Sequence, residues 1–472
     1  MKKLTAMLLA LTMACGVLAG CSGTPSIPGE ESSTPSSSTP AESSKAESST
    51  PEVTEKNFDG VTVKVWGGDL LNNPDFEAFW AENAGGMKYE VVQADDVKMM
   101  SMVASGTAPD VWVLSAFSMG AMYAARGLYE PLDDYIANSD VFDMDNLADV
   151  EGLYRFDGQE VGKGSTYGIV KDWSLDNQLF INKNVFNDCG IPIPDDKTVY
   201  TWDQIRDWAK QMIKFDEDGN QIRWGLASSN DLYQLIAAQL GSIGKSLWSD
   251  DLRSANLDTP EVRAAFEYWV DMYKSNAFVN GVTGGPGDWG GDSFAVDKVG
   301  MMNLGYWFGN GTLAFNDNAK DHLDDYMLIQ APSLDASKQA NACLAGVGGS
   351  IWVGSKNKDA AFRLLELYLG GEWAEKMAKR GFGNPAQLDL VELLPQETSF
   401  QKQTYDANAF GLQNMITLKT NPFVTSQGMS SAFSQYFNEV LFDRMTLDDA
   451  IAGMQNEFNT MIQEGLEICG LE

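Results

Sequence analysis

Histidine, a frequent catalytic and metal-binding side chain, occurs only once in this 472-residue chain, as His322. Most zinc hydrolases need two or more histidines, and Ser-His-Asp enzymes need one beside a nucleophile. A single histidine argues against these schemes, while chemistry by carboxylates stays open. The chain also carries 66 acidic against 33 basic side chains, a net charge of −33. This balance argues against nucleic acid as a partner, because phosphate binding requires clustered lysine and arginine.

Two further patterns resemble ligand loops but fail on spacing. Residues 216–220 (DEDGN) begin like a calcium loop, yet Gln221 stands where the sixth position needs glycine and Ala227 where the twelfth needs glutamate. The glycine-rich stretch 284–291 lacks the strand-to-helix spacing of a phosphate-binding loop. We therefore expect a turn at 216–220, and neither a metal ion nor a cofactor.

Cys21 follows a segment typical of an export signal. Two lysines precede an apolar stretch from 4 to 17, and residues 18–21 (LAGC) resemble the lipobox of bacterial lipoproteins. The resemblance implies a signal peptide over 1–20 and lipidation of Cys21, which would hold the protein at the outer face of the cell membrane. An ordinary secretory signal with an accidental cysteine is the alternative. Residues 21–57 are rich in serine and proline and are predicted to form a disordered tether.

Three cysteines remain in the globular part: Cys189, Cys343 and Cys469. Their number is odd and their spacing is wide, which favours neither a disulfide framework nor a zinc site. We expect them to be small buried thiols.

The elements that must position any site alternate between strand and helix. Thr201, followed by Gln204 three residues later, predicts a capping box at the start of a helix. The alternation predicts an α/β protein with helices on both faces of a sheet and ligands beyond the carboxyl ends of strands. Strands are predicted at 61–66, 89–92, 111–114, 179–182 and 224–227, and helices at 74–83, 99–104, 119–125, 202–212, 231–240, 260–275, 358–369, 430–440 and 447–466.

Several segments resemble, in order, those of extracellular solute-binding proteins of the maltose-binding-protein type, the sugar family 1 of ABC transporters. They are SGTAPDV at 105–111, ARGLYEPLDDY at 125–135, YGI at 167–169, FINKNVF at 180–186, GIP at 190–192, TWDQI at 201–205, KVGMM at 298–302 with GYW at 305–307, and SKNKDAA at 355–361. Together they cover essentially the whole globular part, from about residue 58 to about 465.

The resemblance implies a two-lobed periplasmic-binding-protein fold of type II with a ligand cleft between the lobes. It places residues 58–171 and about 349–400 in the first lobe. It places about 172–345 and about 401–472, including the C-terminal helices, in the second lobe. The chain would cross between lobes near 171–176 and return near 345–349.

The resemblance also implies which residues contact the ligand. Trp307 corresponds to the stacking tryptophan of the family, and Asp69 to a hydrogen-bonding position in the first lobe. Aromatic faces and polar side chains together suit a neutral sugar. The alternative for each residue is a structural role in the core, a helix cap, a hinge or a loop. The further candidates are Trp66, Trp173, Asp172, Asn230, Asp231 and Trp289.

The resemblance implies a non-enzymatic lipoprotein, monomeric, that binds a mono- or oligosaccharide and delivers it to the permease subunits of an ABC importer. Micromolar capture needs about −8 kcal/mol. One stacking contact or hydrogen bond supplies about 1 kcal/mol, so several contacts must act together as the lobes close. A secreted glycoside hydrolase is the rival, because acidic residues beside tryptophans also suit sugar cleavage. A binding protein for a polyamine, peptide or phosphodiester is a third possibility.

Overall fold

The computed structural model describes residues 57–68 and 73–471. The predicted signal peptide, Cys21, the tether up to residue 56 and the candidate Asp69 lie outside the described residues. No helix in the described part is long and apolar enough to cross a membrane.

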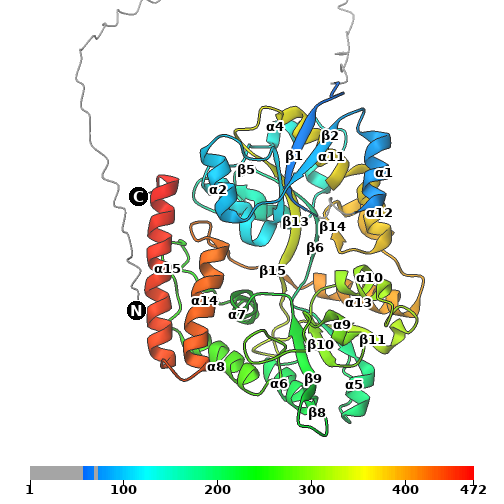
Figure 1. The fold of residues 1–472 in the computed structure, drawn as a ribbon, viewed down its shortest axis with the longest axis vertical. Helices are drawn as coiled ribbons and strands as arrows, with labels where there is room; N and C mark the ends of the chain where they lie inside the picture. Colours follow the sequence, from blue (N-terminus) through cyan, green and yellow to red (C-terminus); the bar gives the residue numbers. More distant parts are fainter. Residues whose placement is uncertain (1–56, 69–72, 472) are drawn as a thin grey trace, which may run out of the picture. The chain divides into compact units, whose positions relative to one another are not determined.

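The first lobe is built on a six-stranded sheet with the strand order β14-β6-β13-β3-β1-β2 (Figure 1). Strands β1, β2 and β3 are parallel to one another, whereas β13 runs antiparallel to both β3 and β6. Its strands are β1 (Thr62–Gly67), β2 (Lys88–Val92), β3 (Val111–Ser115), β6 (Ile169–Ser174), β13 (Ala345–Ile351) and β14 (Asn384–Pro385).

Both faces of this sheet are covered by apolar side chains. Successive side chains of β1 point to opposite faces, and β1 therefore contributes to two cores. Val63 and Val65 join a core with Phe76 and Trp373, whereas Trp66 joins a second core with Trp112. Helix α11 packs on β13, β6 and β1, and α12 packs on α11. The helices of this lobe are α1 (Pro74–Asn83), α2 (Asp96–Ala104), the π-helical turn η2 (Ala116–Gly120), α3 (Ala121–Ala125), α4 (Asp133–Ala137), α11 (Lys358–Leu369) and α12 (Gly371–Arg380).

The second lobe is built on a five-stranded sheet with the order β11-β7-β10-β9-β8. Strands β9 and β10 are parallel, and the other neighbours are antiparallel. A small parallel pair, β12 (Asn341–Cys343) with β15 (Met415–Thr417), accompanies it. The strands of the sheet are β7 (Leu179–Asn182), β8 (Lys214–Phe215), β9 (Gln221–Ser228), β10 (Val299–Asn303) and β11 (Tyr326–Ile329).

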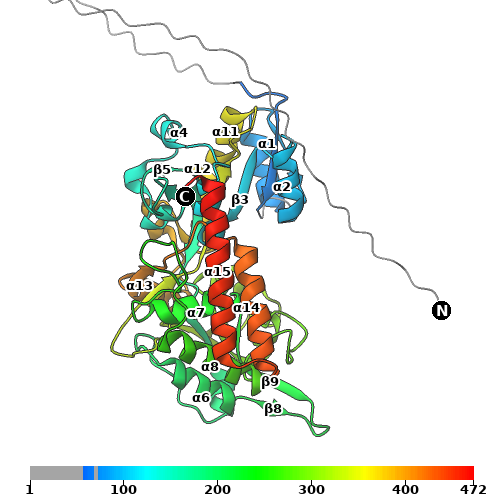
Figure 2. The ribbon, with the colours of Figure 1, turned by 90° about the vertical axis from the view of Figure 1, so that its left-hand side faces the viewer.

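Helices cover the second sheet and then continue into a C-terminal pair. Helix α6 packs on β9, α5 on β7 and β10, and α13 on β11. Helices α14 and α15 lie side by side, and α14 also packs on α7 and α8 (Figure 2). The helices of this lobe are α5 (Lys183–Asp188), α6 (Trp202–Gln211), α7 (Leu232–Gly241), α8 (Pro260–Lys274), α9 (Gly291–Phe294), α10 (Trp307–Gly311), α13 (Ser399–Leu412), α14 (Ser426–Leu441) and α15 (Leu447–Cys469).

The chain passes between the two sheets three times. It leaves the first sheet after β6, returns between β11 and β13, and leaves again after β14. Strand β6 extends to Ser174, past the predicted lobe boundary at residue 171, and β13 begins at Ala345. The remaining short elements are the pair β4 (Arg155–Phe156) and β5 (Ser165–Thr166) and the 3-10 turns η3 (Met144–Asn146), η4 (Asp149–Tyr154), η5 (Leu313–Phe315), η6 (Leu323–Asp325) and η7 (Leu388–Leu393).

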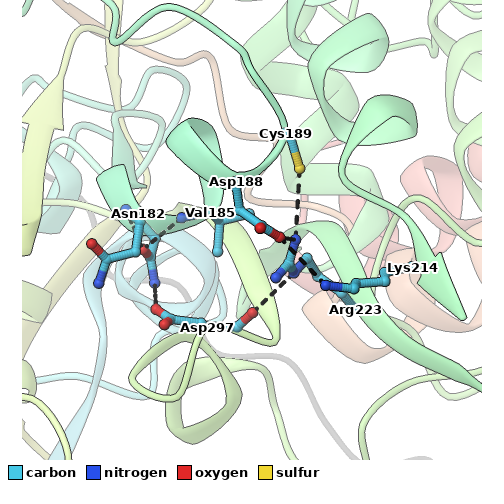
Figure 3. A network of polar contacts seen from close by, with 8 residues as sticks. Asn182, Val185, Asp188, Cys189, Lys214, Arg223 and Asp297 are labelled. Carbon is cyan, nitrogen blue, oxygen red and sulfur yellow. Dashed lines mark hydrogen bonds and ion pairs between the residues drawn. The ribbon is translucent and has the colours of Figure 1, made fainter. Parts of the chain in front are cut away.

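A polar network explains why the sequence FINK turns from strand into helix at Asn182 (Figure 3). The Asn182 carbonyl oxygen caps α5 by accepting from the backbone of Asn184 and Val185, and its amide donates to Asp297 at 2.8 Å. Arg223 donates to the Asp297 backbone oxygen at 3.1 Å and to the Asp188 carboxylate at 2.7 Å. The network ties the end of β7 to the turn before β10.

Several predicted elements are confirmed, and others differ at their ends. Helix α1 spans the predicted residues, and both bonds of the Thr201–Gln204 capping box are present. Helix α2 begins three residues before the prediction, at Asp96, because the Asp95 side chain caps it by accepting from Lys98 N. The helix predicted at 119–125 begins instead as the π-helical turn η2. Of the three cysteines, Cys343 is buried, whereas Cys189 and Cys469 are partly exposed.

Candidate functional site

The predicted residues Asp172 and Trp173 lie near the end of β6, where the chain leaves the first sheet. Trp173 pairs with Asn384 of β14, and Asp172 forms an ion pair with Lys171 at 3.1 Å. Trp173 is buried, and 14% of the Asp172 side chain is exposed. Gly383 has φ +108°, and a Cβ there would stand 3.4 Å from Asp172 Cβ. The segment before β14 therefore packs directly on these two residues.

Trp307 begins helix α10, and its indole is fixed by Asp176 from the crossing segment. The Trp307 Nε1 donates to both carboxylate oxygens of Asp176, at 3.0 and 3.1 Å. The backbone N of Gly305 donates to the same carboxylate at 3.2 Å. A side chain at position 305 would overlap the Ser174 hydroxyl, so glycine is required for this close approach.

Asn230 also contacts Asp176, from the carboxyl end of β9. Its amide donates to the Asp176 backbone oxygen at 2.8 Å. Asp231 has a different role, because it caps α7 in a capping box with Gln234 and accepts from Ser430 at 2.5 Å. Asp231 is exposed and links α7 to α14.

The two other predicted residues in the described part of the chain, Trp289 and Trp66, pack against other aromatic side chains. Trp289 is 41% exposed and contacts Phe308, the residue after Trp307, with ring centroids 5.7 Å apart. Trp66 is 6% exposed, packs edge-on against Trp112 at 5.2 Å and donates to the Ala94 carbonyl. The structure thus gives Trp66 a place in the first-lobe core, and a ligand contact for it stays a prediction.

Phe382 and Asp176 also lie in this region, although neither is among the predicted ligand residues; Asp176 belongs to the predicted crossing segment 171–176. The Phe382 ring lies 6.3 Å from Trp307 and 5.6 Å from the Lys171 ammonium. Its signal in the sequence is an aromatic residue between Gly381 and Gly383, just after α12. Asp176 is the first of three polar residues, DNQ at 176–178, that directly precede the buried strand β7. Polar residues next to a buried strand are the sequence feature that could have indicated a buried polar site here.

The electrostatics of the site centre on Asp176. Burial raises the pKa of this carboxyl to about 6, although the hydrogen bonds from Trp307 and Gly305 act in the opposite direction. The nearby charge of Asp172 raises the pKa further. Polar atoms of the neighbouring residues are also buried. Both side-chain amide atoms of Asn177, the side-chain oxygen of Asn303 and the Trp173 indole N–H have no hydrogen-bond partner among the described residues.

A cavity of about 710 Å³ lies elsewhere, between residues 144–162 of the first lobe and residues 250–252 and 417–420 of the second. Its lining includes Leu147, Leu153, Leu418 and the buried Glu151, and contains none of the predicted ligand residues. The volume suits a small molecule, but the lining lacks the aromatic side chains on which a sugar ring would stack. We place the candidate site at Trp307 for this reason.

Comparison with known protein families decides the class of the protein. The sequence profile of the bacterial extracellular solute-binding proteins matches residues 71–375. The chain belongs to this family. The match includes Trp173, Asp176, Asn230 and Trp307 of the candidate site of this solute-binding protein, whereas Phe382 lies just beyond it.

Solved structures agree on the fold of this solute-binding protein. An ABC substrate-binding protein from Listeria monocytogenes, in complex with cycloalternan, is 20% identical with a TM-score of 0.67, covering 86% of this chain and 100% of that one. A Thermotoga lettingae solute-binding protein bound to α-D-tagatose is 18% identical (TM-score 0.67, covering 85% and 100%). MalE from Bdellovibrio bacteriovorus, bound to maltotriose, is 16% identical (TM-score 0.65, covering 85% and 100%). The comparison with curated proteins finds no match.

Proposed function

We propose that this solute-binding protein captures a mono- or oligosaccharide between its two lobes and delivers it to the permease of an ABC importer. The observation that carries the proposal is the convergence at the lobe crossing. There Trp307 and Phe382 supply aromatic faces beside the polar residues Asp172, Asp176 and Asn230. Flat aromatic faces and fixed polar groups are the two components that sugar recognition needs.

The buried polar atoms support a hydroxyl-rich ligand. A buried donor or acceptor without a partner costs about 1 to 3 kcal/mol. The indole N–H of Trp173 and the amide of Asn177 are such groups in the described part of the chain. Sugar hydroxyls, or water in the ligand-free protein, can satisfy both donors and acceptors. The solutes bound in the similar structures, which include cycloalternan, tagatose and maltotriose, support the same class of ligand.

The proposal has a cellular part that follows from the N-terminal residues. The protein is exported, lipidated at Cys21 and held as a monomer at the outer face of the cell membrane by the tether. The lobe boundaries near residues 171 and 349, and the contacts of Asp69, Trp66, Asp231 and Trp289 with ligand, belong to the proposal as well. Closure of the lobes then presents the loaded protein to the permease subunits.

A sugar panel tests the proposal. Thermal shift with maltotriose, mannobiose, acarbose, cycloalternan, D-mannitol and D-tagatose is followed by calorimetric titration of any sugar that stabilises the protein. A ligand at 100 times its Kd adds about 2.7 kcal/mol of stability. Saturable binding without cleavage supports the proposal. Cleavage of the sugar would favour a glycoside hydrolase. If the protein binds a polyamine, peptide or phosphodiester and no sugar, the proposal that its ligand is a carbohydrate is refuted.

Trp307→Ala locates the site. We expect binding to weaken by roughly 1 to 3 kcal/mol, about 5- to 150-fold in Kd, because truncation removes a stacking face. Trp208→Ala is the matched control, since Trp208 is a half-buried tryptophan of α6 that packs against Phe186 and Tyr200. It should lower the stability and leave the affinity of the folded protein unchanged. Equal affinities of the Trp307 variant and the parent would remove Trp307 from the site.

A further inference from the structure

Asp176 connects three positions of the candidate site through a single residue. Its carboxylate accepts from Trp307 Nε1 and from the backbone N of Gly305, and its backbone oxygen accepts from the Asn230 amide. The partners come from α10, from the turn after β10 and from the loop after β9. Trp307 is 131 residues away in the sequence. Asp176 therefore joins the lobe crossing to both candidate segments of the second lobe.

The choice of an acidic residue here is costly and needs a reason. Asp176 is 4% exposed, and its hydrogen-bond donors are neutral groups: the Trp307 indole and the Gly305 backbone amide. Burying an ionised carboxylate among neutral donors carries a desolvation penalty. A carboxylate does offer one advantage, because its bonds to N–H donors are roughly twice as strong as those of a neutral acceptor. Two oxygens on one indole nitrogen also restrict the ring more than one oxygen would.

We propose that Asp176 is a positioning residue for ligand recognition, which holds the Trp307 ring and the Asn230 amide in their ligand-binding orientations before ligand arrives. The proposal rests on the proposed function and adds a residue to it. Pre-organisation of this kind raises affinity, because the ligand does not have to order the side chains that contact it.

The charge state of Asp176 gives the proposal a pH dependence. With a pKa of about 6, the carboxyl is ionised at pH 7.5 and mostly protonated at pH 5. Among the charged groups around it, Asp172 of β6 acts on it directly, and Lys171 pairs with Asp172 at 3.1 Å. Protonation replaces charge-assisted bonds to Trp307 and Gly305 by weaker ones. We expect wild-type affinity to fall about three- to tenfold from pH 7.5 to pH 5.

Asp176→Asn separates positioning from packing, because asparagine has nearly the same shape without the charge. Titration of the full mature protein with whichever of maltotriose, mannobiose and D-tagatose binds in the panel should give an affinity three- to tenfold below the parent at pH 7.5. The difference between pH 5 and pH 7.5 should largely disappear. Asp188→Asn is the control, because Asp188 is a carboxylate of the same lobe that pairs with Arg223 (Figure 3). It should keep the parental affinity and pH profile. An Asp176→Asn protein with parental affinity and pH profile would overturn the proposal.

A measurement without ligand distinguishes failure of this proposal from failure of the proposed function. The fluorescence of Trp307 in the wild-type protein is the difference between the spectra of wild type and the Trp307→Phe variant. Its fluorescence in the Asp176→Asn protein is the difference between that variant and the double variant that also carries Trp307→Phe. Quenching of that signal by acrylamide should increase when Asp176 is replaced, because the indole loses its fixed acceptor. If no sugar binds the parent protein but the quenching changes, the proposal that the ligand is a carbohydrate fails, whereas the positioning role of Asp176 is supported. Unchanged quenching would overturn the role of Asp176 whatever the ligand is.

Discussion

Glu151 is predicted to lower the stability of this protein as the pH rises from 5 to 8. The residue lies in η4, is 4% exposed and accepts from the backbone N of Val170 at 2.9 and 3.1 Å. Burial raises the pKa of its carboxyl from 4.5 to about 8. The folded protein therefore keeps a proton that the unfolded chain releases. Because the folded-state pKa is the higher one, stability is greatest below pH 4.5 for this group and is lost as the pH approaches 8.

The magnitude follows from the two pKa values. Over the pH range in which Glu151 is ionised in the unfolded chain but protonated in the folded protein, each pH unit lowers the free energy of unfolding by about 1.4 kcal/mol. Between pH 5 and pH 8 the loss from Glu151 is about 3 kcal/mol, a large share of the 5 to 15 kcal/mol typical of a domain. Glu151→Gln is close in shape and cannot ionise. We therefore expect the stability of this variant relative to wild type to rise by about 3 kcal/mol from pH 5 to pH 8.

Urea unfolding followed by tryptophan fluorescence at pH 5, 6, 7 and 8 measures this difference by linear extrapolation. Glu160→Gln provides the control, because Glu160 is an exposed glutamate that pairs with Lys163 on the turn that follows. Removing it reports the effect of one surface charge in the same region. A constant difference between Glu151→Gln and wild type over this pH range would refute the reasoning, since it would mean that the folded protein does not hold the extra proton.

Three further predictions concern the crossing and the N-terminal segment. Gly305→Ala should destabilise the protein by roughly 1 to 3 kcal/mol in urea unfolding, because its Cβ would stand 2.5 Å from Asp176 Oδ1 and overlap the Ser174 hydroxyl; an unchanged midpoint would show that the turn relaxes freely. Cys21→Ser should release the protein from the membrane into the medium, as measured by fractionation, and equal membrane retention would contradict lipidation. Limited proteolysis with mass spectrometry should cut before about Asn57 and spare the rest, whereas protection of that segment would contradict the tether.

Local sequence patterns determined many of the elements, because strands and caps depend on residues close together in the chain. Alternation in 61–66 gave β1, and Thr201 with Gln204 gave the start of α6. The resemblance of segments such as 180–186 and 201–205 added the two-lobed fold, which the family match and similar structures support. Helix ends differed from the prediction where a single side chain caps the helix, as Asp95 does for α2.

The roles of individual aromatic residues were decided only by tertiary packing. Trp66 and Trp307 both follow or end a strand, so the local pattern does not distinguish them. Trp66 is covered by Trp112 and Tyr123, whereas Trp307 is fixed at Asp176 and faces Phe382. Asp176 and Trp307 are 131 residues apart, and they meet because the chain crosses between the two sheets. The periodicity of apolar residues indicates which face of a helix or strand is buried. The residues that pack against this face come from distant parts of the sequence, so the local pattern does not identify them.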